Sequence, residues 1–231
     1  MDKRPSIIRR MFDRIAPTYD LLNTILSFSL DKAWRRAAIN LLEIRAGDAV
    51  LDIATGTGDL ALPAAEGGGK VVGIDLSRQM LLRALGKAGQ QDLLTRYSVV
   101  QGDALSMPFR DETFNSAMVA FGIRNMNNLE AFLAEIYRVL SIRGRFSVLE
   151  FSLPERSLFR WIYGAYLTYV VPIIGGLISG DYDAYRYLRD SVTGFPVPEA
   201  LEGIMKGQGF RVVLSRPIFW GISHLYLIEK R

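Results

Sequence analysis

The feature that most constrains this chain is residues 50–59, Val-Leu-Asp-Ile-Ala-Thr-Gly-Thr-Gly-Asp, where an apolar run leads directly into a glycine turn. The run has the length and composition of a buried strand, and helical spacing follows Asp59. A Gly-x-Gly turn between a strand and a helix lets the backbone approach a ligand closely. We therefore expect a nucleotide-binding α/β unit here.

Strand and helix patterns alternate along the chain after this turn, which predicts a parallel sheet with right-handed crossovers. Ser77 is expected to cap one helix, and Asn127, with Glu130 three residues later, to cap another. Two final β-rich runs joined by a short loop predict an antiparallel hairpin at one sheet edge. The expected strands are 50–53, 70–75, 97–101, 113–121, 145–151, 210–216 and 224–229, and the expected helices after the first include 77–88, 127–140 and 197–207.

Residues 1–46 and 152–195 lie outside this alternation, within what we expect to be a single domain over 1–231. The first region is the most basic part of the chain, and its spacing predicts two or three helices broken near Pro17 and at 27–29. We expect it to form a helical cap. Two interpretations remain open: solvated faces of covering helices, or a cap over a ligand or a membrane-facing surface.

The second region, 152–195, is expected to be a helical insertion after the fifth strand. It contains no charged residue from Trp161 to Gly180, which is about the length of a membrane span. We reject a span because Pro172 and Gly175-Gly176 interrupt the run and because it lies within a continuing α/β pattern. A buried helix pair, or an apolar lid over a greasy substrate or a lipid face, remain as alternatives.

Composition excludes several kinds of site. The chain of 231 residues has no cysteine and a single histidine, His224, so we expect no metal site, no disulfide and no thiolate nucleophile. His224 is expected to be structural. The net charge of +4 permits contact with anionic lipid or nucleic acid but requires neither. No charged-then-apolar signal opens the sequence, and a cytoplasmic protein is expected.

Acidic residues indicate which nucleotide the turn holds. Asp75, at the end of the second strand, is placed to hold ribose hydroxyls, which fits NAD nearly as well as S-adenosylmethionine. Asp52, next to the turn, would repel a pyrophosphate but suit the ammonium of a methionine moiety. Asp59 occupies a helix start that a dinucleotide would need clear of acids. Asp103 can reach an adenine amino group, and Ala104 offers apolar contact. Together they favour S-adenosylmethionine and a Rossmann-like class I methyltransferase.

The order of motifs resembles the ubiquinone/menaquinone biosynthesis C-methyltransferase family over nearly the whole chain. The resemblance implies C-methylation of a polyprenylated quinol, with demethylmenaquinol favoured and 2-polyprenyl-6-methoxy-1,4-benzoquinol as a further substrate. It also implies that Thr57, Asp75, Asp103 and Ala104 contact the cofactor. Some members have serine where this chain has Ala120, so a hydroxyl contact is absent there. The motifs are 11–20 (MFDRIAPTYD), 121–125 (FGIRN), 137–140 (YRVL), 149–152 (LEFS) and 183–188 (DAYRYL). The full set of expected cofactor contacts is Asp52, Thr55, Gly56, Thr57, Gly58, Asp75, Leu76, Asp103, Ala104 and Ala120.

Arg124 follows the fourth strand, at the carboxyl end of the sheet where such folds react. A guanidinium stays protonated, so a direct base role does not suit it. Because the resemblance suggests an acid–base part, we expect Arg124 to orient water and stabilise a phenolate, with Asn125 as helper. The alternative is a structural ion pair with a nearby acid. The expected substrate contacts are Tyr19, Phe121, Tyr185 and Tyr187, and aromatic packing is the alternative for the last two.

A long polyprenyl tail would explain the uncharged insertion, so we expect peripheral contact with the inner face of the membrane. No nucleic-acid partner is expected, and a homodimer is allowed. The alternative functions are methylation of RNA or another small molecule, an NAD-dependent oxidoreductase, and a non-catalytic cofactor-binding protein.

Overall fold

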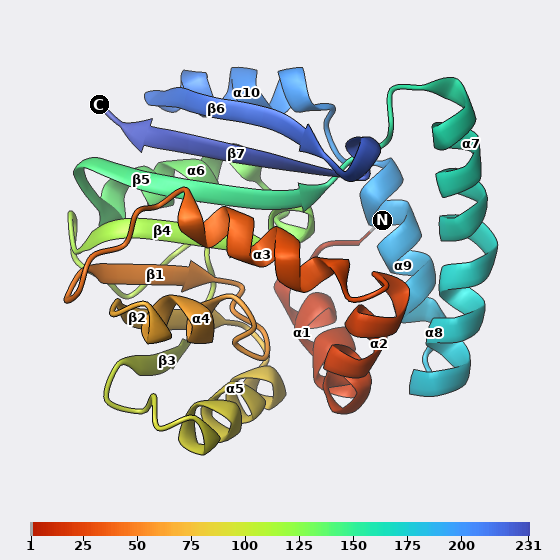
Figure 1. The fold of residues 1–231 in the computed structure, drawn as a ribbon, viewed down its shortest axis with the longest axis horizontal. Helices are drawn as coiled ribbons and strands as arrows, with labels where there is room; N and C mark the ends of the chain where they lie inside the picture. Colours follow the sequence, from red (N-terminus) through yellow and green to blue (C-terminus); the bar gives the residue numbers. More distant parts are fainter. Residues whose placement is uncertain (1) are drawn as a thin grey trace.

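A seven-stranded sheet with strand order β3-β2-β1-β4-β5-β7-β6 is the centre of the computed structural model, which describes residues 2–231 (Figure 1). The first five strands pair in parallel, and β7 pairs antiparallel with both β5 and β6. The expected mixed sheet with a closing antiparallel hairpin is confirmed. The strands are β1 (Ala49–Ile53), β2 (Lys70–Asp75), β3 (Tyr97–Gln101), β4 (Phe114–Ala120), β5 (Leu140–Phe151), β6 (Phe210–Ile218) and β7 (Ser223–Lys230).

Helices cover both faces of the sheet, because successive side chains of a strand point to opposite sides. Val50 of β1 packs in one apolar cluster with residues of three helices, whereas the next residue, Leu51, packs in a second cluster with residues of two others. The first face is covered by α3 (Leu30–Asn40), α4 (Ala61–Glu66) and α5 (Arg78–Gln90), and the second by α6 (Leu129–Val139) and α10 (Pro198–Gly207).

The two predicted helix caps have different outcomes. The Ser77 side chain accepts a hydrogen bond from the backbone N–H of Met80 at 3.1 Å, as expected of a cap. The second predicted cap was wrong by one residue, because Asn128, not Asn127, accepts the bond from Ala131 at 2.9 Å. Asparagine is an equally good cap at either position. A helix that begins after Asn128 buries Phe132, and this is the start that the structure has. β5 also begins earlier than expected, directly after α6.

The cap and the insertion pack against each other beside the carboxyl ends of β1, β4 and β5 (Figure 1). They share a third apolar cluster, to which Met11, Leu22, Tyr163 and Tyr185 belong. The cap helices are α1 (Pro5–Ile15) and α2 (Tyr19–Leu26), joined by a 3₁₀ turn at Ala16–Thr18, and the insertion helices are α7 (Ser157–Ala165), α8 (Val171–Ser179) and α9 (Tyr182–Thr193).

Pro172 and the two glycines were expected to interrupt the long apolar run, but the helix continues through them. A π turn over Tyr166–Val170 joins α7 to α8, so the chain stays helical from Ser157 to Ser179. Proline lacks the N–H that an α-helix needs, and a wider turn before it accommodates the missing bond. A Cβ on Gly175 would overlap the ring of Tyr185, so this glycine lets α8 pack closely on α9. By length and composition, 157–179 is the one helix within residues 2–231 that could cross a membrane.

Candidate functional site

The glycine turn is tied to the end of β2 by hydrogen bonds to one acid. The backbone N–H of Gly56 donates to Asp75 Oδ2 at 2.9 Å, and that of Ser77 donates to Asp75 Oδ1 at 2.8 Å. Ala54 has φ +51° and Gly56 φ +55°, so the backbone follows the left-handed conformation that a tight turn needs. Burial raises the pKa of Asp75 to about 6, although both hydrogen bonds lower it.

A small cavity of about 80 Å³, the turn cavity, lies between this turn, the ends of β2, β3 and β4, and helix α1. It combines a carboxylate at the end of β2 with apolar walls from Leu76, Met80 and Ala104, and Asp103 lies beside it. An acid for ribose hydroxyls next to an apolar slot suits a nucleoside. The expected site residues that line it are Gly56, Asp75, Leu76, Asp103, Ala104, Ala120, Asn125, Tyr19 and Phe121.

The other expected cofactor residues shape the turn and do not line this cavity. Asp52 is 1% exposed and accepts a hydrogen bond from Thr55 Oγ1 at 2.5 Å. Burial raises the pKa of Asp52 to about 7. Thr57 donates to Asp20 Oδ1 at 2.5 Å, and Gly58 packs near Ala84. Contact of these four residues with the cofactor stays a prediction.

Asp59 does not carry the free negative charge that was expected at a helix start. Lys87 forms ion pairs with both Asp59 and Asp20, so the charge of Asp59 is compensated. Helix α4 also begins only at Ala61. The acid therefore does not present a free charge at a helix start, and the preference for S-adenosylmethionine cannot rest on it.

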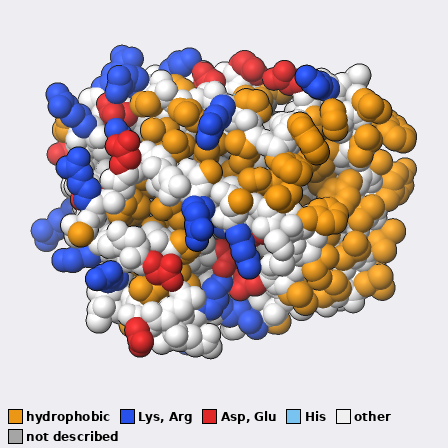
Figure 2. All heavy atoms as spheres, in the orientation of Figure 1, with side chains coloured by type: hydrophobic (Ala, Val, Ile, Leu, Met, Phe, Trp, Pro, Cys, Tyr) orange, Lys and Arg blue, Asp and Glu red, His pale blue; other side chains and the backbone are white. Residues whose placement is uncertain are grey.

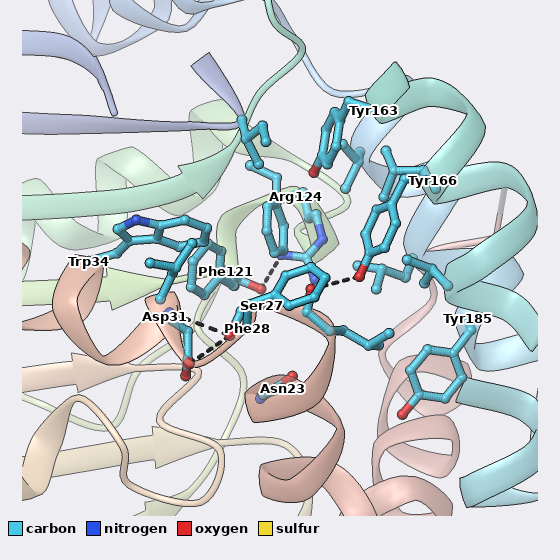
Figure 3. Close-up of a pocket in the computed structure, with 18 of the residues that line it drawn as sticks. Asn23, Ser27, Phe28, Asp31, Trp34, Phe121, Arg124, Tyr163, Tyr166 and Tyr185 are labelled. Atoms are coloured by element: carbon cyan, nitrogen blue, oxygen red, sulfur yellow. Dashed lines mark hydrogen bonds between the residues drawn. The ribbon is translucent and has the colours of Figure 1, made fainter. Parts of the chain in front are cut away.

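A larger cavity of about 350 Å³, the cap cavity, lies between the cap, the insertion and the sheet (Figure 3). Its walls are mostly aromatic and aliphatic, and its volume is in the range of small-molecule sites. Phe12, Tyr19 and Phe121 line both cavities, so the two meet at these rings. The structure places all four expected substrate residues on its wall, which also includes Trp34, Arg124, Phe151, Tyr163 and Leu167.

Arg124 lies on the wall of the cap cavity, and a buried ion pair holds it. Its Nη1 is 2.8 Å from Glu150 Oε1 and also donates to the carbonyl of Phe121. Its Nε donates to Ser191 Oγ at 3.3 Å, and its guanidinium lies over the ring of Phe151, 5.2 Å from the centroid. Among residues 2–231, no hydrogen bond partner is found for Nη2. Arg124 therefore does form the ion pair that was the alternative expectation. Its role in orienting water stays a prediction.

Asn125 connects the two cavities. It lines the turn cavity, and its Oδ1 accepts a hydrogen bond at 3.0 Å from the hydroxyl of Tyr187, which lines the cap cavity. Burial raises the pKa of Tyr187 to about 12, so its hydroxyl keeps its proton at neutral pH and remains a donor.

Several polar residues at this site were not predicted from the sequence. Glu150 lies in the motif at 149–152 but was given no role. An acid inside an apolar strand was the available signal, because a buried carboxylate needs a partner. Asp31 and Arg35 also line the cap cavity, and their spacing of four residues on a helix was a weak signal. Nothing in the sequence pointed to Asn23.

The chain matches the ubiE/COQ5 methyltransferase family over residues 1–227. It is 48% identical over 204 residues to the demethylmenaquinone methyltransferase of Thermus thermophilus, covering 87% of this chain and 92% of that protein. It is 41% identical over 226 residues to the ubiquinone/menaquinone biosynthesis C-methyltransferase UbiE of Geotalea uraniireducens, covering 96% of each. A crystal structure of a SAM-dependent methyltransferase from Aquifex aeolicus shares the fold, with a TM-score of 0.61 at 18% identity over 85% of this chain and 89% of that one.

Proposed function

Because the chain belongs to the ubiE/COQ5 methyltransferase family, we propose that it methylates a ring carbon of a polyprenylated quinol in quinone biosynthesis, using S-adenosylmethionine. The observation that carries this is the contact of the two cavities at Tyr19 and Phe121, which sets an apolar aromatic chamber against a nucleoside-type slot. Demethylmenaquinol is the favoured substrate. The relatives do not favour RNA methylation, since both are named for quinone biosynthesis.

The turn cavity supplies the groups that the cofactor needs. Asp75 would accept hydrogen bonds from ribose hydroxyls, Asp103 would accept one from the adenine amino group, and Leu76 and Ala104 would contact the ring, since all four line this cavity. S-adenosylmethionine, when bound, supplies an electrophilic methyl group on a sulfonium sulfur. Phe121 and Tyr19, which line both cavities, would hold the quinol ring beside that methyl group.

The chemistry depends on a negative charge at one quinol oxygen. Once the hydroxyl proton has passed to water, Arg124 would donate from Nη2 to that oxygen and stabilise the phenolate, whose electron density activates the neighbouring ring carbon. Glu150 holds the guanidinium in place from β5. Because apolar walls screen charges poorly, the attraction between the Arg124 guanidinium and the phenolate is stronger here than it would be in water. Arg124 and Asn125 would orient a water molecule that accepts the ring proton, once the ring carbon carries the methyl group and the cofactor sulfur is left as a neutral thioether.

Methyl transfer tests this proposal directly. The purified protein is given S-adenosylmethionine with a labelled methyl group and, side by side, demethylmenaquinol and 2-polyprenyl-6-methoxy-1,4-benzoquinol. We expect label on demethylmenaquinol, and a slower or equal rate on the second quinol. No transfer to either quinol would refute the function.

A patch of exposed apolar side chains supports peripheral contact with the membrane that holds the tail. On α7 and α8, Trp161 is 72% and Leu177 71% exposed, and apolar side chains gather over this end of the molecule (Figure 2). Exposed patches of this kind mark interaction surfaces. Phe28 and Trp220 line the cap cavity and are 76% and 69% exposed, so the cavity reaches the surface, and Trp220 stacks on Phe159 of α7 with 5.4 Å between ring centroids.

Co-sedimentation with lipid vesicles checks the membrane contact. Replacing Trp161 and Leu177 by asparagine is expected to reduce binding severalfold, because it removes apolar area from the interface. Leu94, 57% exposed before β3, provides the matched control, and Leu94→Asn is expected to bind as the unmodified protein does. Equal binding by all three proteins, or none by the unmodified one, would contradict the assignment.

A further inference from the structure

A group of polar side chains from α2 and α3 lies on the wall of the cap cavity, which is mostly aromatic and aliphatic. It consists of Asn23 of α2 and of Asp31 and Arg35 of α3, and all three line the cavity. Asp31 is 5% and Arg35 7% exposed, so both charges are buried. Asp31 Oδ1 accepts a hydrogen bond from Ser27 Oγ at 2.8 Å, and its other oxygen is 3.6 Å from Arg35 Nε, beyond hydrogen-bond length.

Two donors in this group have no partner. Within residues 2–231, Asn23 Nδ2 and Arg35 Nε are buried without a hydrogen bond, and both residues line the same cavity. The remaining unpartnered buried atoms are the hydroxyls of Ser147 and Ser223, which lie in β5 and β7. Buried donors in folded proteins are almost always satisfied, so unpaired donors on a cavity wall indicate a polar ligand atom.

The arrangement mirrors the site around Arg124. The guanidinium of Arg35 lies over the ring of Phe121, 5.3 Å from its centroid, and Phe121 stacks on Phe151 with 4.3 Å between centroids. Arg124 lies over Phe151 in turn. Two buried arginine–carboxylate pairs therefore flank one aromatic stack, and Figure 3 shows Phe121 between Arg124 and Asp31.

We propose that Asn23, Asp31 and Arg35 form a second polar subsite, which binds the quinol oxygen para to the one that Arg124 holds. This rests on the proposed function, since a quinol has two hydroxyls at opposite ends of its ring. A hydroxyl donates to the carboxylate of Asp31 and accepts from Arg35 or Asn23. A quinone carbonyl can only accept, which leaves Asp31 facing an oxygen without a donor. The subsite therefore selects the reduced ring.

Calorimetric binding with matched ligands tests the subsite without turnover. The ligands are 2-geranyl-1,4-naphthalenediol, 3-geranyl-1-naphthol, in which hydrogen replaces the hydroxyl beside the tail, and 2-geranyl-1,4-naphthoquinone. Oxygen is excluded so that the diol stays reduced. We expect the diol to bind the unmodified protein at least about tenfold more tightly than either other ligand, as for loss of a hydrogen bond to a charged group. Equal affinities for the diol and the naphthol would overturn the subsite.

Two variants separate recognition of the second hydroxyl from general packing of the ligand in the cavity. Asp31→Asn is expected to reduce the preference for the diol to less than about threefold while leaving naphthol affinity unchanged. Asn23→Ala provides a second variant, because Asn23 Nδ2 has no hydrogen bond that the fold could lose. A preference that persists in both variants, or an equal weakening of diol and naphthol, would refute the proposal.

Methyl transfer to the same diol distinguishes a failure of the proposed function from a failure of the subsite. If the unmodified protein prefers the diol in binding but transfers no methyl group to it, the proposed function fails and the subsite stands. If the protein methylates the diol and the variants keep the full preference, the function stands and the subsite fails.

Discussion

Arg124 and Glu150 form a buried ion pair across neighbouring strands, with 2.8 Å between Nη1 and Oε1 and side chains that are 7% and 1% exposed. The carboxylate also accepts hydrogen bonds from the backbone N–H of Arg124 at 3.1 Å and of Phe151 at 2.8 Å. Glu150 is thus fully occupied with holding one side chain and one turn. The position of the guanidinium in the cap cavity is set by β5, although Arg124 itself follows β4.

Replacing Glu150 by leucine is expected to lower the free energy of unfolding by about 3–5 kcal/mol, because it leaves a buried guanidinium without its counter-charge. Adding Arg124→Met should restore most of the stability but no methyl transfer. Urea denaturation and initial rates measure the two effects. The control is Glu43→Leu, which breaks the exposed pair with Arg145 and should cost less than about 1 kcal/mol. A loss from Glu150→Leu no larger than that of the control would contradict the ion-pair argument.

Arg124→Lys is expected to lower kcat about 100-fold, because lysine carries the charge but cannot hold Glu150 and a quinol oxygen with separate nitrogens. Affinity for S-adenosylmethionine should stay within about twofold, since Arg124 does not line the turn cavity. Initial rates and cofactor titration check this. Full turnover by the lysine variant would rule out the positioning role.

Cofactor binding is expected to weaken as the pH falls through about 6, where Asp75 gains a proton, loses its negative charge and becomes a weaker acceptor for ribose hydroxyls. Below that pH, affinity should fall about tenfold per unit. The effect of Asp75 on the free energy of unfolding has the opposite pH dependence. Because the pKa of Asp75 in the folded protein is raised above 3.8, its contribution to stability is fully present below pH 3.8 and is lost as the pH rises through about 6.

Titration calorimetry between pH 5 and pH 8 measures this dependence. An Asp75→Asn variant should bind the cofactor about tenfold more weakly at neutral pH and lack the step near pH 6. Parallel curves for the two proteins would show that another group is responsible.

Gly175→Ala is expected to destabilise the protein by about 1–3 kcal/mol, because the added methyl overlaps the ring of Tyr185, which lies on the wall of the cap cavity. The displaced ring should also raise KM for the quinol. Gly164→Ala is the matched control on α7: its Cβ meets nothing within 4 Å, so a gain of about 0.5–1 kcal/mol is expected. Thermal unfolding and substrate titration give the readouts. Equal effects of the two substitutions would be inconsistent with close packing of α8 on α9.

Periodicity, turn residues and chain order are local signals, and they were enough to predict the alternating strands and helices, the closing hairpin, the glycine turn and the acid at the end of β2. The motifs that show the family can also be read directly from the residues. The folded chain was needed to see that Glu150 holds Arg124, that Asp59 is paired with Lys87, and that Asn23 and Arg35 face the same cavity as Phe121. Those relationships join segments far apart in the chain, and which side chains meet there depends on how the cap and the insertion pack on the sheet.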